Sequence, residues 1–223
     1  MSARPVILLG GGPGADRRAA KLLWRRVVQA AGKDHPTFAY VGCASGDSPE
    51  FRAYFEEPLK QAGAGKVKPV LLCGRKPDLA AARAVVDEAD AVFVSGGDVE
   101  RGISVLEKSG FAETLKKLAA EGKPFSGLSA GSLMLARAWV RWRDPEDDST
   151  AEIFPCLGIA PVYCDAHDEE SGWSELKFLL KLLPHGSTGW GIPSGGGLAV
   201  HPGGEVEWFG AEPALCRGDI MAP

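Results

Sequence analysis

Short apolar runs alternate with amphipathic segments from residue 6 to about residue 138, and this alternation constrains the fold more than any other feature of the chain. The first run is apolar throughout, which is typical of a strand buried on both faces. The predicted strands are Val6–Leu9, Thr37–Val41, Val67–Leu72, Ala91–Val94 and Phe125–Leu128. The predicted helices between them are Ala15–Ala31, Pro49–Ala62, Pro77–Ala89 and Ile103–Ala120. This order predicts right-handed crossovers and a parallel sheet with helices on both faces.

The last third of the chain has a different character. Residues 141–149 are mostly polar and are expected to form a surface loop. A short strand at Pro161–Cys164, a helix at Gly172–Leu183 and strands at Thr188–Ile192, Leu198–His201 and Glu205–Phe209 are predicted next, with a hairpin turn at residues 202–204. Because no shift in composition marks a linker, we expect one α/β domain over residues 1–223. It should be a three-layer sandwich with a mostly parallel central sheet and a β-rich C-terminal third.

Composition and charge limit the class of protein. Hydrophobic residues make up 45% of the chain and charged residues 24%, which is ordinary for a soluble globular protein. The net charge is −4 and no basic run occurs, so nucleic acid is not an expected partner. No apolar run reaches the roughly 18 residues that span a bilayer, so we expect no membrane partner and a cytoplasmic protein. An odd count of five cysteines without a C-x-x-C pair argues against a disulfide framework or a structural zinc site.

The pentapeptide Gly127-Leu-Ser-Ala-Gly131 follows the last predicted strand of the parallel region and has the form G-x-S-x-G. A strand that turns directly into a helix passes through one strained residue, and flanking glycines remove the Cβ atoms that would clash. Ser129 stands at the apex, so its hydroxyl is expected at the carboxyl edge of the sheet, where sites form in such folds. The N–H of Ala130 is expected to point to the place of an acyl oxyanion. An ordinary strand–helix turn would show the same pattern.

A second glycine-rich loop, residues 10–14, follows the first predicted strand. Its glycine spacing resembles part of a dinucleotide-binding turn. However, the third glycine is misplaced and no acidic residue closes the second strand near Tyr40. No Gly-Lys-Ser/Thr follows, which excludes a P-loop. We therefore expect a tight turn that borders a site, and no nucleotide cofactor.

A serine nucleophile needs a general base, and the chain has four histidines. His35 and His185 lie in loops that are expected at the amino edge of the sheet, and His201 lies in or beside the hairpin. His167 lies 38 residues after Ser129, in a loop after a short predicted strand that can reach the carboxyl edge. Position alone leaves a surface histidine as an alternative for His167.

Four segments occur in an informative order along the chain: Ser95-Gly-Gly-Asp98, Gly127–Ala136, His167 and Gly191-Ile-Pro-Ser-Gly195. Together they resemble the dipeptidase E and cyanophycinase family of serine peptidases, whose fold is similar to that of class I glutamine amidotransferases. The resemblance runs from Val6 to Phe209. It implies Ser129 as nucleophile, His167 as general base, and the N–H groups of Gly97 and Ala130 as the oxyanion hole. It also implies a short peptide substrate and neither a metal nor an organic cofactor.

The sequence departs from the family at the third member of the triad. The family has a glutamate in the turn where this chain has Ser194. Ser194 could complete a weaker Ser–His–Ser triad, since a hydroxyl can accept the histidine N–H and fix the tautomer. A nearby carboxylate, Asp165, Asp168 or Glu169, could replace the glutamate instead. The site could also have lost catalysis and retained only binding.

The expected substrate differs from that of dipeptidase E, which carries basic residues after its histidine and prefers an amino-terminal aspartate. This chain has Asp168-Glu-Glu170 at that place. A carboxylate-bearing first residue would be repelled, whereas a free α-amino group or a basic side chain would be attracted. We therefore take Asp98, Asp168 and Glu169 as substrate-binding candidates. A solvated loop that caps the following helix is the alternative for this acidic stretch.

Other functions stay open at this stage. The same residues could serve a hydrolase of small amides or esters, or a binding protein without catalysis. Metal-dependent hydrolysis by Asp165, His167 and Asp168 is disfavoured, because the three lie too close in sequence and lack a second histidine. The oligomeric state is open, with a homodimer among the options.

Several large side chains near these segments receive no role. Trp139, Trp142, Trp173 and Trp190 are expected in the core or at its rim. Arg141 and Arg143 could meet a peptide carboxylate, although a solvated loop is the stronger expectation for both.

Overall fold

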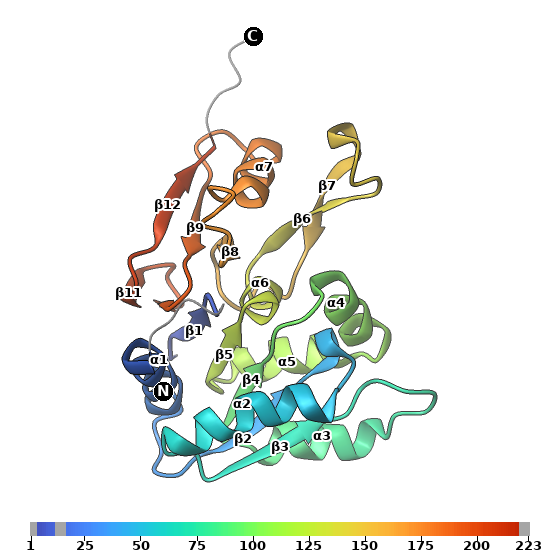
Figure 1. The fold of residues 1–223 in the computed structure, drawn as a ribbon. Helices are drawn as coiled ribbons and strands as arrows, with labels where there is room; N and C mark the ends of the chain where they lie inside the picture. The colour runs from blue at the N-terminus through green and yellow to red at the C-terminus, as the bar shows by residue number, and fades with distance from the viewer. Residues whose placement is uncertain (1–3, 12–16, 219–223) are drawn as a thin grey trace.

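The computed structural model describes residues 4–11 and 17–218 and is built on a seven-stranded sheet (Figure 1). Five strands are parallel, in the spatial order β1 (Val6–Leu9), β5 (Phe125–Leu128), β4 (Ala91–Val94), β2 (Thr37–Val41) and β3 (Lys66–Val70). Two antiparallel strands, β10 (Gly196–Val200) and β11 (Val206–Gly210), extend the β1 edge. The expected mostly parallel sheet, including the β10–β11 hairpin, is confirmed.

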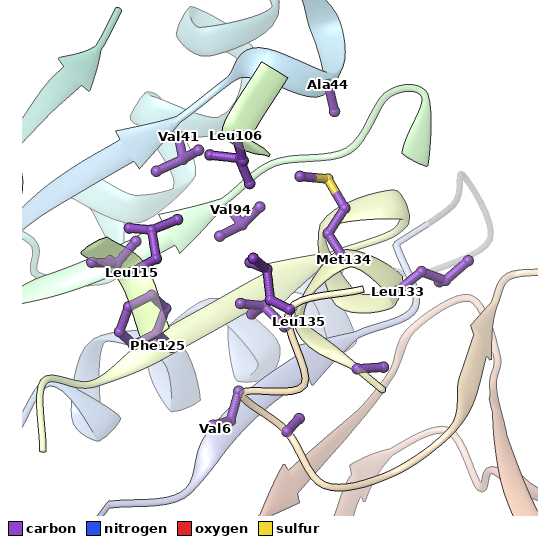
Figure 2. Close-up of a cluster of buried hydrophobic side chains, with 14 of the residues drawn as sticks. Val6, Val41, Ala44, Val94, Leu106, Leu115, Phe125, Leu133, Met134 and Leu135 are labelled. Carbon is purple, nitrogen blue, oxygen red and sulfur yellow. The ribbon is translucent and has the colours of Figure 1, made fainter. Parts of the chain in front are cut away.

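Helices cover both faces of this sheet because strand residues alternate between two buried layers. Ile7 and Leu9 pack toward α1 (Arg17–Ala30) and α2 (Pro49–Gln61). Val6 and Leu8 belong to the opposite layer, which is shown in part in Figure 2. That layer is covered by α3 (Leu79–Glu88), α4 (Val99–Lys108), α5 (Phe111–Ala120) and α6 (Ala130–Leu135). The three-layer sandwich therefore follows from strands that are apolar on both faces.

The prediction of one helix over Ile103–Ala120 is wrong, since two helices occupy this region. Asp98 begins α4 by accepting a hydrogen bond from the Arg101 N–H at 2.7 Å. The first helix ends at Lys108, and Gly110 then adopts a left-handed conformation with φ 73° before α5 begins. A continuous helix cannot pass through that conformation. The apolar periodicity nevertheless continues across the break, and this is why the sequence predicted a single helix.

The C-terminal third forms a second, three-stranded sheet and a long hairpin. The sheet has the order β12 (Ala214–Arg217), β9 (Thr188–Ile192) and β8 (Cys164–Ala166), and α7 (Ser174–Leu182) packs beside it. The hairpin pairs β6 (Ala138–Trp142) with β7 (Ala151–Pro155). The short helices η1 (Cys43–Ser45) and η2 (Asp148–Thr150) complete the described elements.

Two sequence predictions need correction in this third. The expected loop at residues 141–149 is partly strand, because Arg141 pairs across the hairpin with Glu152 and charge complementarity stabilises the register. The strand expected at Pro161–Cys164 begins at Cys164 and continues to Ala166. Strand β12 was not predicted.

The environment of the cysteines and the length of the helices are two further properties of the described residues. All five cysteines are free, and burial raises the pKa of the Cys43 and Cys156 thiols to about 12, as expected of structural thiols. Within residues 4–11 and 17–218, no helix combines the length and apolar character needed to cross a bilayer.

Candidate active site

The carboxyl ends of the parallel strands bring Ser129 and His167 together. Ser129 follows β5, and His167 follows β8 of the second sheet. The Ser129 hydroxyl oxygen lies 2.8 Å from Nε2 of His167. This is the distance of a nucleophile and its general base, and it joins two sheets that are far apart in sequence.

Backbone packing holds Ser129 in the strained conformation of a nucleophile elbow. Its φ of 54° and ψ of −126° lie outside the ordinary regions for a non-glycine residue. Its N–H donates to the Leu9 carbonyl at 2.9 Å. A Cβ at Gly127 would lie 2.5 Å from the carbonyl oxygen of Gly131, and a Cβ at Gly131 would overlap the Val94 carbonyl. Both flanking glycines are therefore required by close backbone approach, as predicted.

Ser132 stabilises the elbow by hydrogen bonds to β1, and this role was not predicted from the sequence. Its buried hydroxyl donates to the Leu9 carbonyl at 2.9 Å and accepts from the Leu9 N–H at 3.0 Å. The side chain thus ties the first turn of α6 to the end of β1. The segment Ala130–Leu135 is otherwise apolar and buried, so its hydroxyl could have indicated a hydrogen bond of this kind.

His167 is fixed by its backbone. Its N–H donates to the Ile192 carbonyl at 2.8 Å, and its φ of 48° turns the chain sharply at the end of β8. The other histidines lie elsewhere: His35 precedes β2, His185 lies in the loop after α7, and Nε2 of His201 lies 3.2 Å from Glu207. Of the four histidines, only His167 contacts Ser129.

Ser194 contacts Glu169 and does not contact the imidazole. The Ser194 N–H donates to Oε1 of Glu169 at 2.9 Å. Burial raises the pKa of Glu169, but hydrogen bonds from the Ser194 backbone and hydroxyl, with the charge of His167, outweigh it, so that the pKa is lowered. No residue within the described ranges makes a hydrogen bond to Nδ1 of His167. A carboxylate from the His167 loop is thus held against the turn in which the family carries its glutamate.

Gly97 and Ala130, the two expected oxyanion donors, line the same cavity as Ser129. Gly97 has a φ of 137°, and a Cβ there would crowd the Ala44 carbonyl at 2.5 Å. The loop is held in place by the Asp98 N–H, which donates to the same carbonyl at 3.1 Å. In the part of the chain that the structure describes, the N–H groups of Gly97 and Ala130 have no acceptor. Both are therefore available to a ligand at Ser129.

A cavity of about 290 Å³ opens on one side of Ser129 and is named here the acidic pocket. Its carboxylates are Asp98, Asp165, Asp168 and Glu175, and its lining also includes Ser129, His167 and Trp139. Three of these carboxylates have protein partners. Asp98 caps α4, Asp168 accepts from the Ser174 N–H at 3.1 Å at the start of α7, and Glu175 accepts from the Trp139 indole at 2.8 Å.

Asp165 differs from the other three carboxylates because one of its two oxygens is buried without a hydrogen bond to any described residue. Its side chain belongs to a residue only 5% exposed. Oδ1 accepts from the Ala166 N–H at 2.7 Å, whereas Oδ2 has no hydrogen-bond partner among the described residues. Burial, helped by the nearby charges of Glu175 and Asp168 and opposed by the backbone N–H groups of Ala166 and Leu176, raises the pKa of Asp165 to about 7. Within the described residues, no three His, Cys, Asp or Glu side chains form a metal-binding group.

A second, larger cavity of about 570 Å³ also reaches Ser129 and is named here the apolar pocket. Helices α1 and α2 supply most of its wall, and Leu128 and Gly97 extend it to Ser129. Its large side chains are Leu23, Trp24, Phe51, Tyr54 and Phe55. This pocket was not predicted from the sequence, because residues so far apart along the chain meet only through the packing of α1 against α2.

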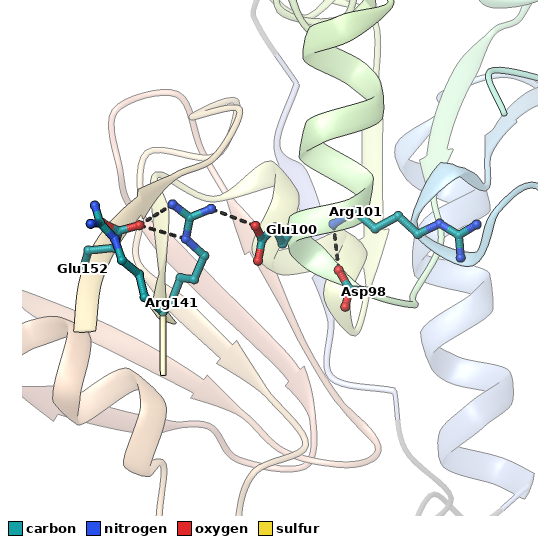
Figure 3. Close-up of polar contacts among 6 residues, drawn as sticks. Asp98, Glu100, Arg101, Arg141 and Glu152 are labelled. Carbon is teal, nitrogen blue, oxygen red and sulfur yellow. Dashed lines mark hydrogen bonds and ion pairs between the residues drawn. The ribbon is translucent and has the colours of Figure 1, made fainter. Parts of the chain in front are cut away.

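The arginines and tryptophans near the site have structural contacts. Arg141 binds Glu152 and also Glu100 at 2.8 Å, as Figure 3 shows, so its guanidinium is already paired. Arg143 also binds Glu152, at 2.7 Å, but its side chain is 75% exposed in the bend after β6. The expected solvated loop therefore describes Arg143 and is wrong for Arg141, which lies in β6. Trp173 packs over Gly191, where a Cβ would overlap its ring.

Gly10 lies against the turn that holds Ser194, since a Cβ at Gly10 would overlap the Pro193 carbonyl. The first glycine loop therefore borders the site at this end. The rest of that loop, residues 12–16, lies outside the described residues, and the expectation of a tight turn there remains a prediction.

The sequence matches Peptidase family S51 over residues 6–201. Peptidase E of Streptomyces coelicolor is 40% identical over 84 residues, which cover 37% of this chain and 33% of that protein. The Pyridoxal 5'-phosphate synthase subunit PdxT of Geobacillus sp. (strain WCH70) is 32% identical over 79 residues, covering 35% of this chain and 41% of that protein. The matched part of the chain thus spans about a third of the first relative's length and about two fifths of the second's.

Two solved structures share the fold. The crystal structure of a peptidase from an acI-B1 Actinobacterium has a TM-score of 0.74 at 19% identity and covers 97% of this chain and 92% of that one. A structure from Listeria monocytogenes EGD-e has a TM-score of 0.66 at 14% identity, covering 95% of this chain and all of the other. At these identities the matches show the fold alone, and they confirm the predicted architecture.

Proposed function

This chain belongs to peptidase family S51, and we propose that it hydrolyses short peptides with Ser129 as nucleophile and His167 as general base. The observation that carries the proposal is the 2.8 Å separation of the Ser129 hydroxyl and Nε2 of His167 at a strained elbow. The free N–H groups of Gly97 and Ala130 support it, because they supply the oxyanion hole that acyl transfer requires.

The proposed reaction has two steps, acylation of Ser129 and hydrolysis of the acyl-serine. The Ser129 oxygen attacks the peptide carbonyl carbon while its proton passes to Nε2 of His167. The tetrahedral oxyanion, held by Gly97 and Ala130, collapses as the carbon–nitrogen bond breaks, and His167 returns the proton to the leaving amine. Water then attacks the acyl-serine, gives its proton to His167, and the acid is released as that proton returns to Ser129. Each oxyanion donor is typically worth about 3 kcal/mol of barrier.

We propose that Glu169, positioned by Ser194, replaces the glutamate missing from the turn. Ser194 holds this carboxylate through its backbone N–H and its hydroxyl, and the imidazole and carboxylate interact electrostatically. A carboxylate at this place stabilises the imidazolium that forms during attack, which a serine hydroxyl alone cannot do. Ser194 is then a positioning residue rather than a third triad member.

The apolar pocket gives a second element of substrate binding. It reaches Ser129, which it shares with the acidic pocket, and is lined by aromatic side chains of α2. We propose that it receives an apolar side chain of the peptide, because burial of such a group there removes apolar surface from water.

The test of the proposed function compares wild type with Ser129→Ala on a panel of dipeptide and tripeptide amides, with amino-acid release measured by mass spectrometry. We expect at least about a 10³-fold loss of kcat/KM, because nothing else at the elbow can form the acyl intermediate. A fluorophosphonate should label wild type at Ser129 and leave the variant unlabelled. Absence of both cleavage and labelling in wild type would instead favour a protein that only binds peptides.

A further inference from the structure

The loop that carries the Gly97 N–H is held in place by the turn that follows β2. The Asp98 N–H donates to the Ala44 carbonyl at 3.1 Å, and a Cβ at Gly97 would lie 2.5 Å from that carbonyl oxygen. Ala44 belongs to η1, within the turn formed by residues 42–47. The orientation of the Gly97 N–H therefore depends on where this turn, named here the η1 turn, lies.

Asp47 connects the η1 turn to a third segment, the one that follows β3. Its Oδ2 atom accepts hydrogen bonds from the Leu72 N–H at 2.6 Å and from the Cys73 N–H at 2.7 Å. The Asp47 N–H donates to the Gly42 carbonyl at 3.0 Å, which closes the turn. One carboxylate thus fixes the position of the η1 turn relative to the edge strand of the sheet.

The conformation of Asp47 is unfavourable in two respects. Its φ of 58° is uncommon for a residue other than glycine and costs free energy. Its Oδ1 atom is buried and has no hydrogen-bond partner among the described residues. Strained residues persist where the surrounding contacts hold them, and they cluster at functional sites. The contact of the η1 turn with Gly97 indicates which function Asp47 serves.

We propose that Asp47 is a positioning residue for the oxyanion hole and acts on the Gly97 N–H through the Ala44 carbonyl. This inference rests on the proposed function and adds a residue that lines neither of the pockets at Ser129. Without the carboxylate, the η1 turn loses its hydrogen bonds to the segment after β3, and the support of Gly97 can shift. A displacement of about 1 Å in a catalytic group can lower a rate by about 100-fold. Because the oxyanion forms only after attack, the loss should appear in kcat and not in KM.

A matched carboxylate separates this role from ordinary stabilisation of the fold. Asp78 also accepts a backbone N–H, that of Ala81 at 2.9 Å, where it begins α3, and it lines neither pocket at Ser129. Asp78→Ala should therefore lower stability, as Asp47→Ala does, and leave the rates unchanged. Asp47→Asn keeps an oxygen for both N–H groups and tolerates a positive φ, so we expect rates within about threefold of wild type.

Two measurements test the proposal, one of position and one of reactivity. Amide hydrogen exchange at Asp98 should be faster in Asp47→Ala than in wild type, because the Ala44 carbonyl that accepts this N–H is no longer held. In the same variant, kcat for alanyl-phenylalanine amide and the rate of Ser129 labelling by a fluorophosphonate should fall by about 10- to 100-fold, with KM unchanged. Far-ultraviolet circular dichroism would verify that each variant is folded.

The two measurements keep this proposal separate from the proposed function. Unchanged exchange at Asp98 overturns it even where wild type cleaves peptides, and so does faster exchange with unchanged rates in an active enzyme. Equal losses of kcat in Asp47→Ala and Asp78→Ala also overturn it, because the effect is then one of stability. Faster exchange in Asp47→Ala alone, restored by Asp47→Asn, supports it even where wild type proves inactive and the proposed function fails.

Discussion

The two pockets that meet at Ser129 have opposite chemistry and different origins. The acidic pocket depends on the C-terminal third, where β8, its following loop and α7 supply Asp165, His167 and Glu175. The apolar pocket depends on the first third, where α1 and α2 supply aromatic side chains such as Phe51 and Tyr54. Ser129 belongs to neither third and lines both cavities.

This difference suggests a division of roles between the two ends of the chain. The C-terminal side carries the proposed base His167, the carboxylate of Glu169 and the acidic pocket, so changes there should alter turnover and stability. On the N-terminal side, α1 and α2 present only apolar surface to the site, so changes in these helices should alter affinity alone. Three variants test this division of roles.

The largest expected effect is a gain in stability from Asp165→Asn. Burial raises the pKa of Asp165 from 3.8 to about 7. Between about pH 4 and pH 7 the folded protein therefore keeps a proton on Asp165 that the unfolded chain has already released. The contribution of this group to the free energy of unfolding therefore falls as pH rises through that interval. Asparagine removes the dependence, and we expect it to stabilise the protein by up to ~4 kcal/mol at pH 8 and by less at pH 5. Urea unfolding at both pH values measures this.

Other ionisable groups near Asp165 complete that test. Glu175, Asp168, Cys164 and Cys216 are the groups that interact with its charge. Their interaction with the Asp165 charge is lost in the variant, so it forms part of the measured difference between variant and wild type. Asp34→Asn, an exposed matched control, should change the free energy of unfolding by little at either pH. An equal gain at pH 5 and pH 8 would show that Asp165 is not a buried charge.

The next effect in size concerns Glu169→Gln. We expect kcat to fall by about 10- to 100-fold, the usual scale for a group that orients a functional side chain. KM should stay unchanged, because Glu169 is proposed to act on the base and not on the bound peptide. A rise in KM with kcat unchanged would instead show that Glu169 contributes to substrate binding.

Two further variants separate position from charge in this loop. Glu170→Gln changes the neighbouring exposed carboxylate and should leave kcat and KM unchanged. Ser194→Ala removes the hydroxyl but keeps the backbone N–H that binds Oε1 of Glu169, so we expect a loss of only a few-fold. A larger loss for Ser194→Ala than for Glu169→Gln would restore the Ser–His–Ser triad as the better interpretation.

The sequence predicted the parallel half of the fold well because periodicity and glycine spacing report on backbone geometry. Strands such as Val6–Leu9 and Phe125–Leu128 appear at the predicted residues, and the elbow glycines are required where expected. The break at Gly110 was missed, since both helices keep the same apolar face across it. Strand β6 was not predicted, because its charged residue Arg141 is typical of a loop until the hairpin places it opposite Glu152.

The candidate site was predictable only where one residue type carries the signal. Ser129 and His167 could be identified, and the structure brings their side chains into contact. Nothing in the sequence reveals that Ser194 holds Glu169, that Asp165 is buried with one oxygen unpartnered, or that α1 and α2 form an aromatic wall. These features depend on which loops meet at the sheet edge, and that is settled by tertiary packing.

The smallest expected effect is that of Tyr54→Ala on the apolar pocket. Tyr54 is 73% exposed at the pocket and lies edge-on against Phe55, with ring centroids 5.1 Å apart, so its removal should cost little stability. We expect KM for alanyl-phenylalanine amide to rise by about three- to tenfold while kcat and the rate–pH profile stay unchanged. Alanyl-glycine amide, which offers no side chain to the pocket, should be affected much less. Trp208→Ala, an exposed aromatic on β11 away from Ser129, serves as the matched control. A fall in kcat, or an equal loss for both peptides, would mean that the two sides of Ser129 are not separable in this way.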